Sequence, residues 1–431
     1  LDFYILLIPR KDVRLLKKKF FELLCEIKIG TCITVGLSNS NKIVLRIIKC
    51  NPHSSTLEGI DRNKKYVIIN TNEIAYFTIS KNSCKPPPPV QTPNIYVTNR
   101  GSNTVSVIDS TTNTVIKTIS VGNRPTFIST NSSINRIYVG NQDSNNISVI
   151  DSTTNTVIAT IPLKNSPEQI SINPSTDLIY VSESRSNNIS VIDGITNTII
   201  ATIPLDSFPN QISINPSTNL IYVSKFTTTF LIKDITVIDG TTNTIITTIP
   251  IAETPFAIDI NPSNNFIYVT STDSNNILSV IDSTTNAVIA TIPVSKSSNE
   301  IDINPLTNKI YVKSELRNKI YVIDANTYDI KAIIPTRESP VEVGINSSTN
   351  RIYVVNLRDN SVSVIDGNCD IVIATIPVDI FPIAMSINPS TNRIYVANAF
   401  GNNVSVIDGT TNTVITTIPV GERPTDIKIN F

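Results

Sequence analysis

Aspartate is the residue whose recurrence first suggests chemistry in this chain. It closes the tripeptide Val-Ile-Asp at eight places, and most copies continue as D-x-x-T-N. A carboxylate can act as a general acid or base, but eight equivalent ones have no joint use in one reaction. An aspartate also accepts backbone N–H groups two residues further on, and asparagine tolerates a left-handed backbone. We therefore predict turn caps rather than catalytic acids at Asp109, Asp151, Asp193, Asp239, Asp282, Asp324, Asp366 and Asp408.

Other residues with catalytic or metal-binding chemistry are few. The single histidine, His53, precedes the region in which these aspartates recur, so His-based proton transfer and His-ligated copper or haem are not expected there. The sequence has no CxxC, CxxCH or GxSxG motif, no Gly-rich phosphate loop and no tryptophan. We predict a non-catalytic protein without cofactor or metal. A lactonase- or lyase-like reaction that uses carboxylates, alone or with Ca²⁺, is the alternative.

The first 90 residues differ in charge from the rest. They hold 15 Lys/Arg and 7 Asp/Glu, a net of +8, whereas residues 91–431 hold 20 and 28, a net of −8. The segment Arg10–Leu24 has apolar residues at helical spacing, and the runs "TCITVGL", "KIVLRIIKC", "KKYVIIN" and "EIAYFTI" read as strands. We predict a small basic α+β domain over residues 1–85, a helix before a small β-barrel, which resembles Sm-like barrels. Its positive charge, including Lys17–Lys19, makes nucleic acid or another anionic partner an alternative function.

A proline-rich segment, "CKPPPPVQTP", divides the chain at Cys84–Pro93. Consecutive prolines favour a stiff, extended spacer, so residues 86–93 are predicted to be a linker. No apolar run is long enough for a membrane-spanning helix. Buried free thiols are expected for the cysteines, with one or two disulfides, or cross-links to other chains, as the alternative; these residues are Cys25, Cys32, Cys50, Cys84 and Cys369.

From residue 94 onward the sequence repeats with a period of about 42 residues. Each copy holds four short runs rich in Ile, Val, Tyr and Thr, separated by turn residues. Four antiparallel strands in roughly 40–50 residues are typical of a propeller blade. We predict an all-β, eight-bladed β-propeller over residues 94–431. Its copies are marked by the tyrosine of Ile-Tyr-Val, at Tyr96, Tyr138, Tyr180, Tyr222, Tyr268, Tyr311, Tyr353 and Tyr395.

The first and last copies are complementary halves. The first begins at the Ile-Tyr-Val run, and the last ends with "PTDIKIN", Pro424–Asn430, with no such run after it. We predict that this C-terminal segment supplies the innermost strand of a blade whose other three strands come from residues 94–121. Such a closure removes the free edges of an open array.

The repeat text resembles a known family. "YVTN" stands at Tyr96–Asn99, and "INPSTNRIYVANAFGNNVSVIDGTTNTVITTIPVGERP" at Ile387–Pro424 resembles the YVTN-type β-propeller repeat of bacterial and archaeal surface and envelope proteins. The resemblance covers about residues 94–431. It implies a propeller at the cell surface or envelope, or outside the cell; a cytoplasmic location is the alternative. Members of that family are usually seven-bladed, and this chain counts eight copies.

The copies differ from one another on one predicted face. Turns between first and second strands, and between third and fourth strands, are nearly constant and share what we call the turn face. Blade-to-blade links and second-to-third loops vary and share the link face. Variation leaves the link face free to bind a protein or surface polymer. Its candidate partner-binding residues are Phe208, Phe226, Phe230, Phe256, Phe381, Phe400, Arg124, Arg185, Arg317, Arg337, Arg358 and Arg423. The function predicted is therefore a non-catalytic binding or scaffold protein.

Overall fold

The computed structural model divides the chain into two compact units, residues 1–91 and 92–431. It describes the backbone of five strands between residues 32 and 79, and residues 93–184, 186–226, 233–261, 263–271, 276–295 and 298–431. The predicted N-terminal helix and the proline run lie outside the described residues. No helix in the described ranges is long and apolar enough to cross a membrane.

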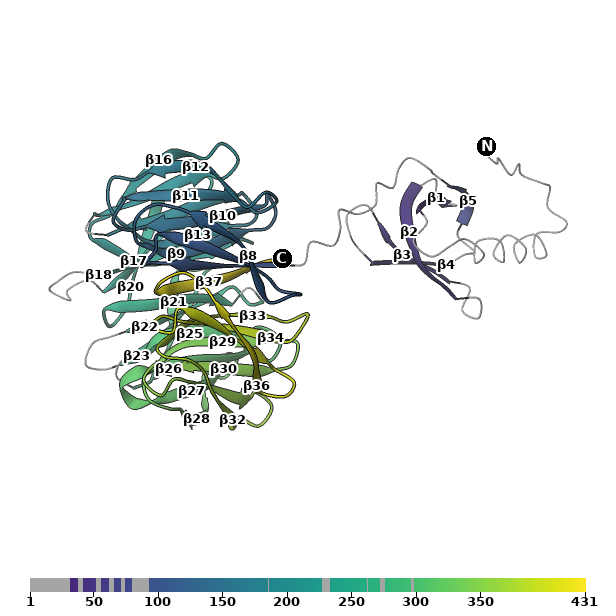
Figure 1. Ribbon diagram of the computed structural model, residues 1–431. Helices are drawn as coiled ribbons and strands as arrows, with labels where there is room; N and C mark the ends of the chain where they lie inside the picture. Colours follow the sequence, from purple (N-terminus) through teal and green to yellow (C-terminus); the bar gives the residue numbers. More distant parts are fainter. Residues whose placement is uncertain are drawn as a thin grey trace. The chain divides into compact units, whose positions relative to one another are not determined.

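The first unit contains one five-stranded antiparallel sheet in the order β4-β3-β2-β1-β5. Four of its strands match runs that the sequence indicates, and β3 was not among them. The strands are β1 Cys32–Leu37, β2 Lys42–Asn51, β3 Thr56–Asp61, β4 Tyr66–Asn70 and β5 Ile74–Ile79 (Figure 1).

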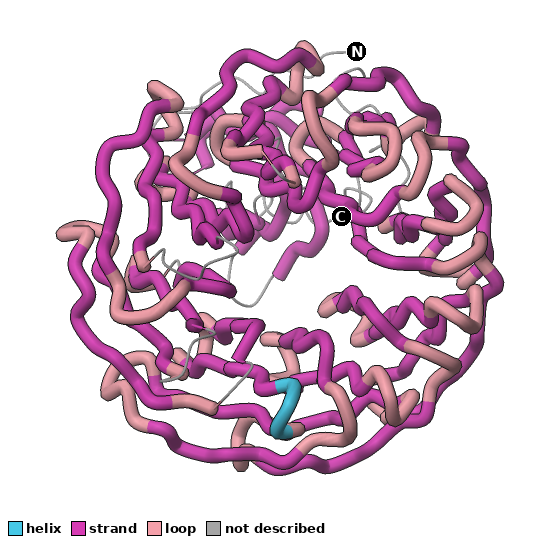
Figure 2. Tube along the Cα trace, turned by 90° about the vertical axis from the view of Figure 1, so that its left-hand side faces the viewer, coloured by secondary structure: helices cyan, strands magenta, loops and turns pink. Residues whose placement is uncertain are grey.

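The second unit is an all-β propeller of eight four-stranded antiparallel blades arranged in a ring (Figure 2), as the repeat predicts. We number the blades from β9. Blade 1 is β9 Pro125–Asn131, β10 Arg136–Asn141, β11 Asn146–Asp151 and β12 Thr156–Pro162. Blade 2 is β13 Pro167–Asn173, β14 Leu178–Glu183, β15 Asn188–Asp193 and β16 Thr198–Pro204. Blade 3 is β17 Phe208–Asn215, β18 Leu220–Phe226, β19 Asp234–Asp239 and β20 Thr244–Pro250. Blade 4 is β21 Pro255–Asn261, β22 Phe266–Ser271, β23 Ile277–Asp282 and β24 Ala287–Pro293.

The remaining blades continue the same order. Blade 5 is β25 Ser298–Asn304, β26 Lys309–Ser314, β27 Lys319–Asp324 and β28 Ile330–Pro335, with a short 3₁₀ turn η2 at Glu315–Arg317. Blade 6 is β29 Pro340–Asn346, β30 Arg351–Asn356, β31 Ser361–Asp366 and β32 Ile371–Pro377. Blade 7 is β33 Pro382–Asn388, β34 Arg393–Asn398, β35 Asn403–Asp408 and β36 Thr413–Pro419. Blade 8 joins β37 Pro424–Asn430 to β6 Asn94–Asn99, β7 Thr104–Asp109 and β8 Thr114–Ser120.

Burial explains the order of the strands within a blade. The second and third strands are buried on both faces and read as nearly continuous apolar runs, such as "RIYVGN" in β10. The fourth strand alternates between exposed and half-buried residues, as an outer edge does. The first strands of consecutive blades contact one another and lie innermost.

The hydrophobic core lies between blades rather than within them. One cluster joins Tyr138 and Val149 of blade 1 to Ile170 and Val181 of blade 2. A blade therefore cannot bury its apolar faces alone, and stability requires neighbours on both sides. The ring is complete in this sense, because blade 8 shares one cluster with blade 7 and another with blade 1.

Pairing of β37 with β6 confirms the predicted closure. Ile427 lies opposite Val97 and Ile429 opposite Ile95, in antiparallel register. Both isoleucines are buried. The split blade is thus formed by segments more than 300 residues apart in the sequence, the β6–β8 segment and the C-terminal strand.

Candidate functional site

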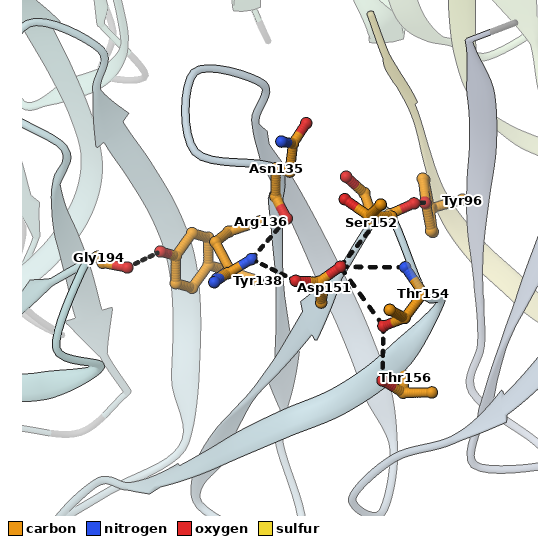
Figure 3. A network of polar contacts seen from close by, with 10 residues as sticks. Tyr96, Asn135, Arg136, Tyr138, Asp151, Ser152, Thr154, Thr156 and Gly194 are labelled. Carbon is orange, nitrogen blue, oxygen red and sulfur yellow. Dashed lines mark hydrogen bonds and ion pairs between the residues drawn. The ribbon is translucent and has the colours of Figure 1, made fainter. Parts of the chain in front are cut away.

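The repeated aspartates cap turns, as predicted. Asp151 Oδ1 accepts the backbone N–H groups of Thr153 at 2.9 Å and Thr154 at 3.0 Å (Figure 3). At Asp193, the N–H of Thr196 contributes most to lowering the pKa of the carboxyl, because it stabilises the ionised form. These carboxylates lie on the turn face, and they already accept hydrogen bonds from the turns that they cap.

The turn face also bonds neighbouring blades together. Asn173, at the end of the first strand of blade 2, donates from Nδ2 to Asn219 Oδ1 of blade 3 at 2.7 Å. The Tyr138 hydroxyl of blade 1 donates to the Gly194 carbonyl of blade 2 at 3.3 Å (Figure 3). An asparagine amide donates in the same way in the pairs Asn131–Asp177, Asn215–Asn265, Asn261–Asn308, Asn304–Asn350 and Asn346–Asn392. Buried polar groups need hydrogen-bond partners. The bonds between blades therefore explain why these turns have nearly the same sequence in every copy.

At four links of the link face, the residue before the link proline is held through its backbone N–H rather than its side chain. Asn103, in the loop after β6, accepts the backbone N–H of Arg124 at 2.8 Å, and Arg124 has a left-handed φ of 55°. The same bond recurs at three further links, in the pairs Asn318–Ser339, Asn360–Phe381 and Asn402–Arg423. Because only the backbone is used, the residue before each link proline can vary in type.

Two predicted arginines come together at the seam between blades 8 and 1. Arg124 and Arg423 line a pocket of about 520 Å³ with Arg100, which the sequence prediction did not include. Asp143 lies on the same pocket, and its Oδ1 is 3.3 Å from Arg124 Nη1. We call this feature the seam pocket. Its charged groups, three arginines and one aspartate, favour anions.

Predicted aromatic residues form two pairs on the link face. Phe381 and Phe400 stack with ring centroids 4.3 Å apart, and Phe400 is 56% exposed. Ile380, next to them in the link, is 55% exposed. Phe208 and Phe226 are tilted, with centroids 5.8 Å apart. Phe381 itself is half-buried. A stacked aromatic pair with one exposed ring beside an exposed isoleucine is suited to a contact surface; we call Ile380, Phe381 and Phe400 the aromatic patch.

The other predicted residues do not join either group. Phe256 is exposed, Arg317 ends the 3₁₀ turn η2, and Arg337 lines a separate pocket of about 290 Å³ with Pro335 and Val372. The remaining three are Arg358, which lies in an exposed loop, and Phe230 and Arg185, which fall outside the described residues.

The innermost strands carry polar side chains that the sequence prediction missed. Gln169 Oε1 of blade 2 accepts the N–H of Ile212 in blade 3 at 2.5 Å, and Gln211 accepts that of Ile258 in blade 4 at 2.6 Å. An innermost strand has an unpaired edge, and these bonds satisfy its free N–H groups. The same bond is made by carboxylates in the pairs Glu300–Val343, Glu342–Met385 and Asp426–Ile128.

Burial raises the pKa of the carboxyl groups on the innermost strands of blades 4 to 6. Burial raises the pKa of Asp259 to about 7 and that of Glu342 to about 8. Burial, followed by the charges of Asp259 and Glu300, raises the pKa of Asp302 well above its ordinary value. In blade 8, the carboxylate of Asp426 raises the pKa of Lys428. We call the five acids, Asp259, Glu300, Asp302, Glu342 and Asp426, the inner acidic arc.

A comparison of copies along the first strands would have found this arc. Counted from the link proline, or from Ser298 in blade 5, the third residue is Gln in blades 2 and 3 and Glu or Asp in blades 5, 6 and 8. The arc was not predicted because its residues lie on strands, whereas the predicted residues were taken from loops and links. Within the described residues no group of three or more His, Cys, Asp or Glu side chains is arranged to hold a metal ion. Cys369 is a free thiol, but it is exposed rather than buried as predicted, because it lies in a turn between outer strands.

Comparison with known proteins shows the fold. No protein-family model matches the sequence, and no curated protein matches it. Among solved structures, the dihydro-heme d1 dehydrogenase NirN in complex with DHE has a TM-score of 0.68 at 11% identity, covering 78% of this chain and 75% of that one. AztD from Citrobacter koseri has a TM-score of 0.62 at 13% identity, covering 78% and 97%. Kuenenia stuttgartiensis hydrazine synthase has a TM-score of 0.55 at 19% identity, covering 66% and 95%. At these identities the likeness concerns the propeller architecture alone.

Proposed function

We propose that the chain is a non-catalytic binding protein of the YVTN-repeat type that presents its link face to a partner at the cell envelope. The observation that carries this proposal is the unequal use of the two faces. Turn-face side chains such as Asn173 and Tyr138 form hydrogen bonds between neighbouring blades. On the link face the recurring bond engages Phe381 and Arg124 only through their backbone N–H groups, so it leaves the type of their side chains open to selection for binding.

The partner proposed is a protein or surface polymer that contacts the aromatic patch. Aromatic side chains and arginine are enriched where partners bind, and Phe400 is more than half exposed although its ring is large and apolar. Leaving such a group in water costs about 1.5–3 kcal/mol relative to burial. A partner that covers the patch recovers that free energy.

Binding to the envelope fraction of the source cells tests this proposal. The double variant F381S/F400S removes the patch, and serine is compatible with this link because Ser339 occupies the equivalent position with the same left-handed backbone. The control, I195T/L306S, removes two exposed apolar side chains from the turn face, where other copies carry Thr and Ser. We expect F381S/F400S to bind at least roughly tenfold more weakly, with an unchanged melting temperature. Equal loss in both variants would contradict a dedicated face.

Acid–base catalysis is a second candidate function, and the inner acidic arc favours it. A carboxyl with a pKa near 8, such as Glu342, is protonated at neutral pH and can act as a general acid. Such shifts gather at catalytic sites, although structural networks share them. Turnover of a panel of lactones that falls as pH rises through about 8, and is lost in E342Q, would support this function. A nucleic-acid role for the basic N-terminal residues stays a prediction, because their side chains lie outside the described part of the chain.

A further inference from the structure

We propose that the seam pocket binds a ligand carrying two or more phosphate or sulfate groups. This inference rests on the proposed function, because it names a ligand chemistry for one part of the same link face. The pocket holds about 520 Å³, room for two such groups and the atoms that join them. Three guanidinium groups and one carboxylate line it, a net charge of 3 − 1 = +2.

Backbone bonds hold the arginines in place. The Arg100 N–H donates to the Arg423 carbonyl at 3.0 Å, and the neighbouring Gly101 N–H donates to the Glu422 carbonyl at 2.8 Å. A Cβ at residue 101 would lie 2.8 Å from Glu422 Cβ, so only glycine permits this close approach. The two arginine-bearing segments are therefore fixed side by side, and Asn103 fixes Arg124 through its backbone N–H.

Most of the hydrogen-bonding capacity of these arginines is unused. A guanidinium has five N–H donors. Arg124 uses Nη1 toward Asp143 at 3.3 Å, while its buried Nε has no hydrogen-bond partner. The guanidinium groups of Arg100 and Arg423 make no hydrogen bond or ion pair with any residue that the structure describes. Phosphate and sulfate oxygens match the planar fork of arginine, and two such groups can engage all three side chains.

The ring itself does not require arginine at these places. Equivalent link positions hold Ser166, Ser339 and Phe381. Ser339 and Phe381 adopt the same left-handed backbone as Arg124 and Arg423. Arginine before the link proline occurs at adjacent links in the ring, those leading into β37 and β9. The positive charge is thus concentrated at one seam.

Ligand binding at this pocket is coupled to closure of the ring. Arg100 follows β6 and Arg423 precedes β37, the two strands whose pairing completes blade 8. An open ring separates these residues and has no pocket. A ligand that binds only the closed form stabilises it by mass action, so the melting temperature rises with ligand concentration.

The full chain is tested by calorimetry and thermal melting with two probes, inorganic pyrophosphate and a disulfated disaccharide, and with inorganic phosphate for comparison. The variant R124S/R423S uses the residue of equivalent links, and R124K/R423K keeps the charge without the fork. The matched control is R337S, which removes one arginine from another link. We expect a probe to bind, to raise the melting temperature, and to bind roughly tenfold more weakly for each seam arginine lost to serine. R124K/R423K should bind with intermediate affinity and R337S like the parent.

Each outcome decides the proposal. Binding of pyrophosphate alone identifies a phosphate ligand, and binding of the disaccharide alone identifies a sulfated one. Absence of binding by both probes at millimolar concentration overturns the proposal, as does an equal effect of R337S. If neither probe binds while F381S/F400S still loses the envelope partner, the seam-pocket proposal fails and the proposed function stands. The melting temperature of each variant is measured first without ligand, so that a folding defect is not mistaken for lost binding.

Discussion

Replacing Glu342 with glutamine should stabilise the propeller at neutral and alkaline pH. Glu342 accepts the backbone N–H of Met385, and two other blades make the same bond with Gln169 and Gln211. The amide therefore keeps the bond between blades. What it removes is an ionisable group whose pKa burial raises from 4.5 to about 8 in the folded protein.

The magnitude and sign of this effect follow from proton linkage. Between pH 4.5 and 8 the folded form binds more protons at Glu342 than the unfolded form, so stability falls as pH rises through that window. At pH 7 the cost is about 1.36 × (2.5 − 0.04), or about 3 kcal/mol, relative to a neutral side chain. For residues 92–431, at about 2.1 cal/mol/K per residue, this is a gain of about 4 °C in melting temperature for E342Q.

Thermal melting of parent and E342Q at pH 4.5, 7 and 8.5 measures this prediction. The two should melt alike at pH 4.5, and the gain of the variant should grow as pH rises. E422Q, which changes an exposed glutamate on the link face, is the control and should melt like the parent throughout. A variant no more stable than the parent at pH 8.5 would refute the assignment of a destabilising charge to Glu342.

Two further predictions concern the same ring. Glu300→Gln, the same substitution at the same place in blade 5, should lower the melting temperature at pH 7. The reason is that the Nζ of buried Lys313, 3.0 Å from Glu300 Oε2, loses its counter-charge. The expected loss of stability is about 3 kcal/mol, and restored stability in E300Q/K313M would confirm the cause. Deletion of residues 424–431 should cost about 3–6 kcal/mol from the lost burial of Ile427 and Ile429 alone, whereas the total free energy of unfolding of a protein is typically about 5–15 kcal/mol. The truncated chain should therefore melt at a far lower temperature or aggregate. A truncated chain that melts like its parent would show that β37 does not close the ring.

The sequence predicts the architecture well because each copy repeats the same physical solution. The period of Tyr96 and its equivalents is sufficient for the blade count, and the complementary ends are sufficient for the closure. The Asp-x-x-Thr-Asn text likewise identifies the turn caps. All three features are present in the order of residues along the chain, and none depends on which side chains meet in space.

Features formed between blades were harder to predict. Arg100 was not predicted because it lies in the loop after β6, whereas Arg124 and Arg423 lie in blade-to-blade links. The three residues come together only when the ring closes. The role of Glu342 depends on the N–H of Met385, 43 residues further along. Phe381 and Phe400 were both among the predicted residues, yet their stacking could not be inferred from their separate loops. The β3 strand, "TLEGID", was missed because it carries two acids and a glycine among its six residues.

The split blade has a consequence for synthesis on the ribosome. Strands β6, β7 and β8 are made before the other blades, but their innermost partner, β37, emerges more than 300 residues later. At about 5–20 residues per second, the edge of β6 stays unpaired for at least about 15 seconds. During that interval the nascent protein exposes the unpaired backbone edge of this six-residue strand, which can pair with other chains. Chaperone capture of nascent chains should therefore be strongest at this edge, and it should end when β37 leaves the exit tunnel.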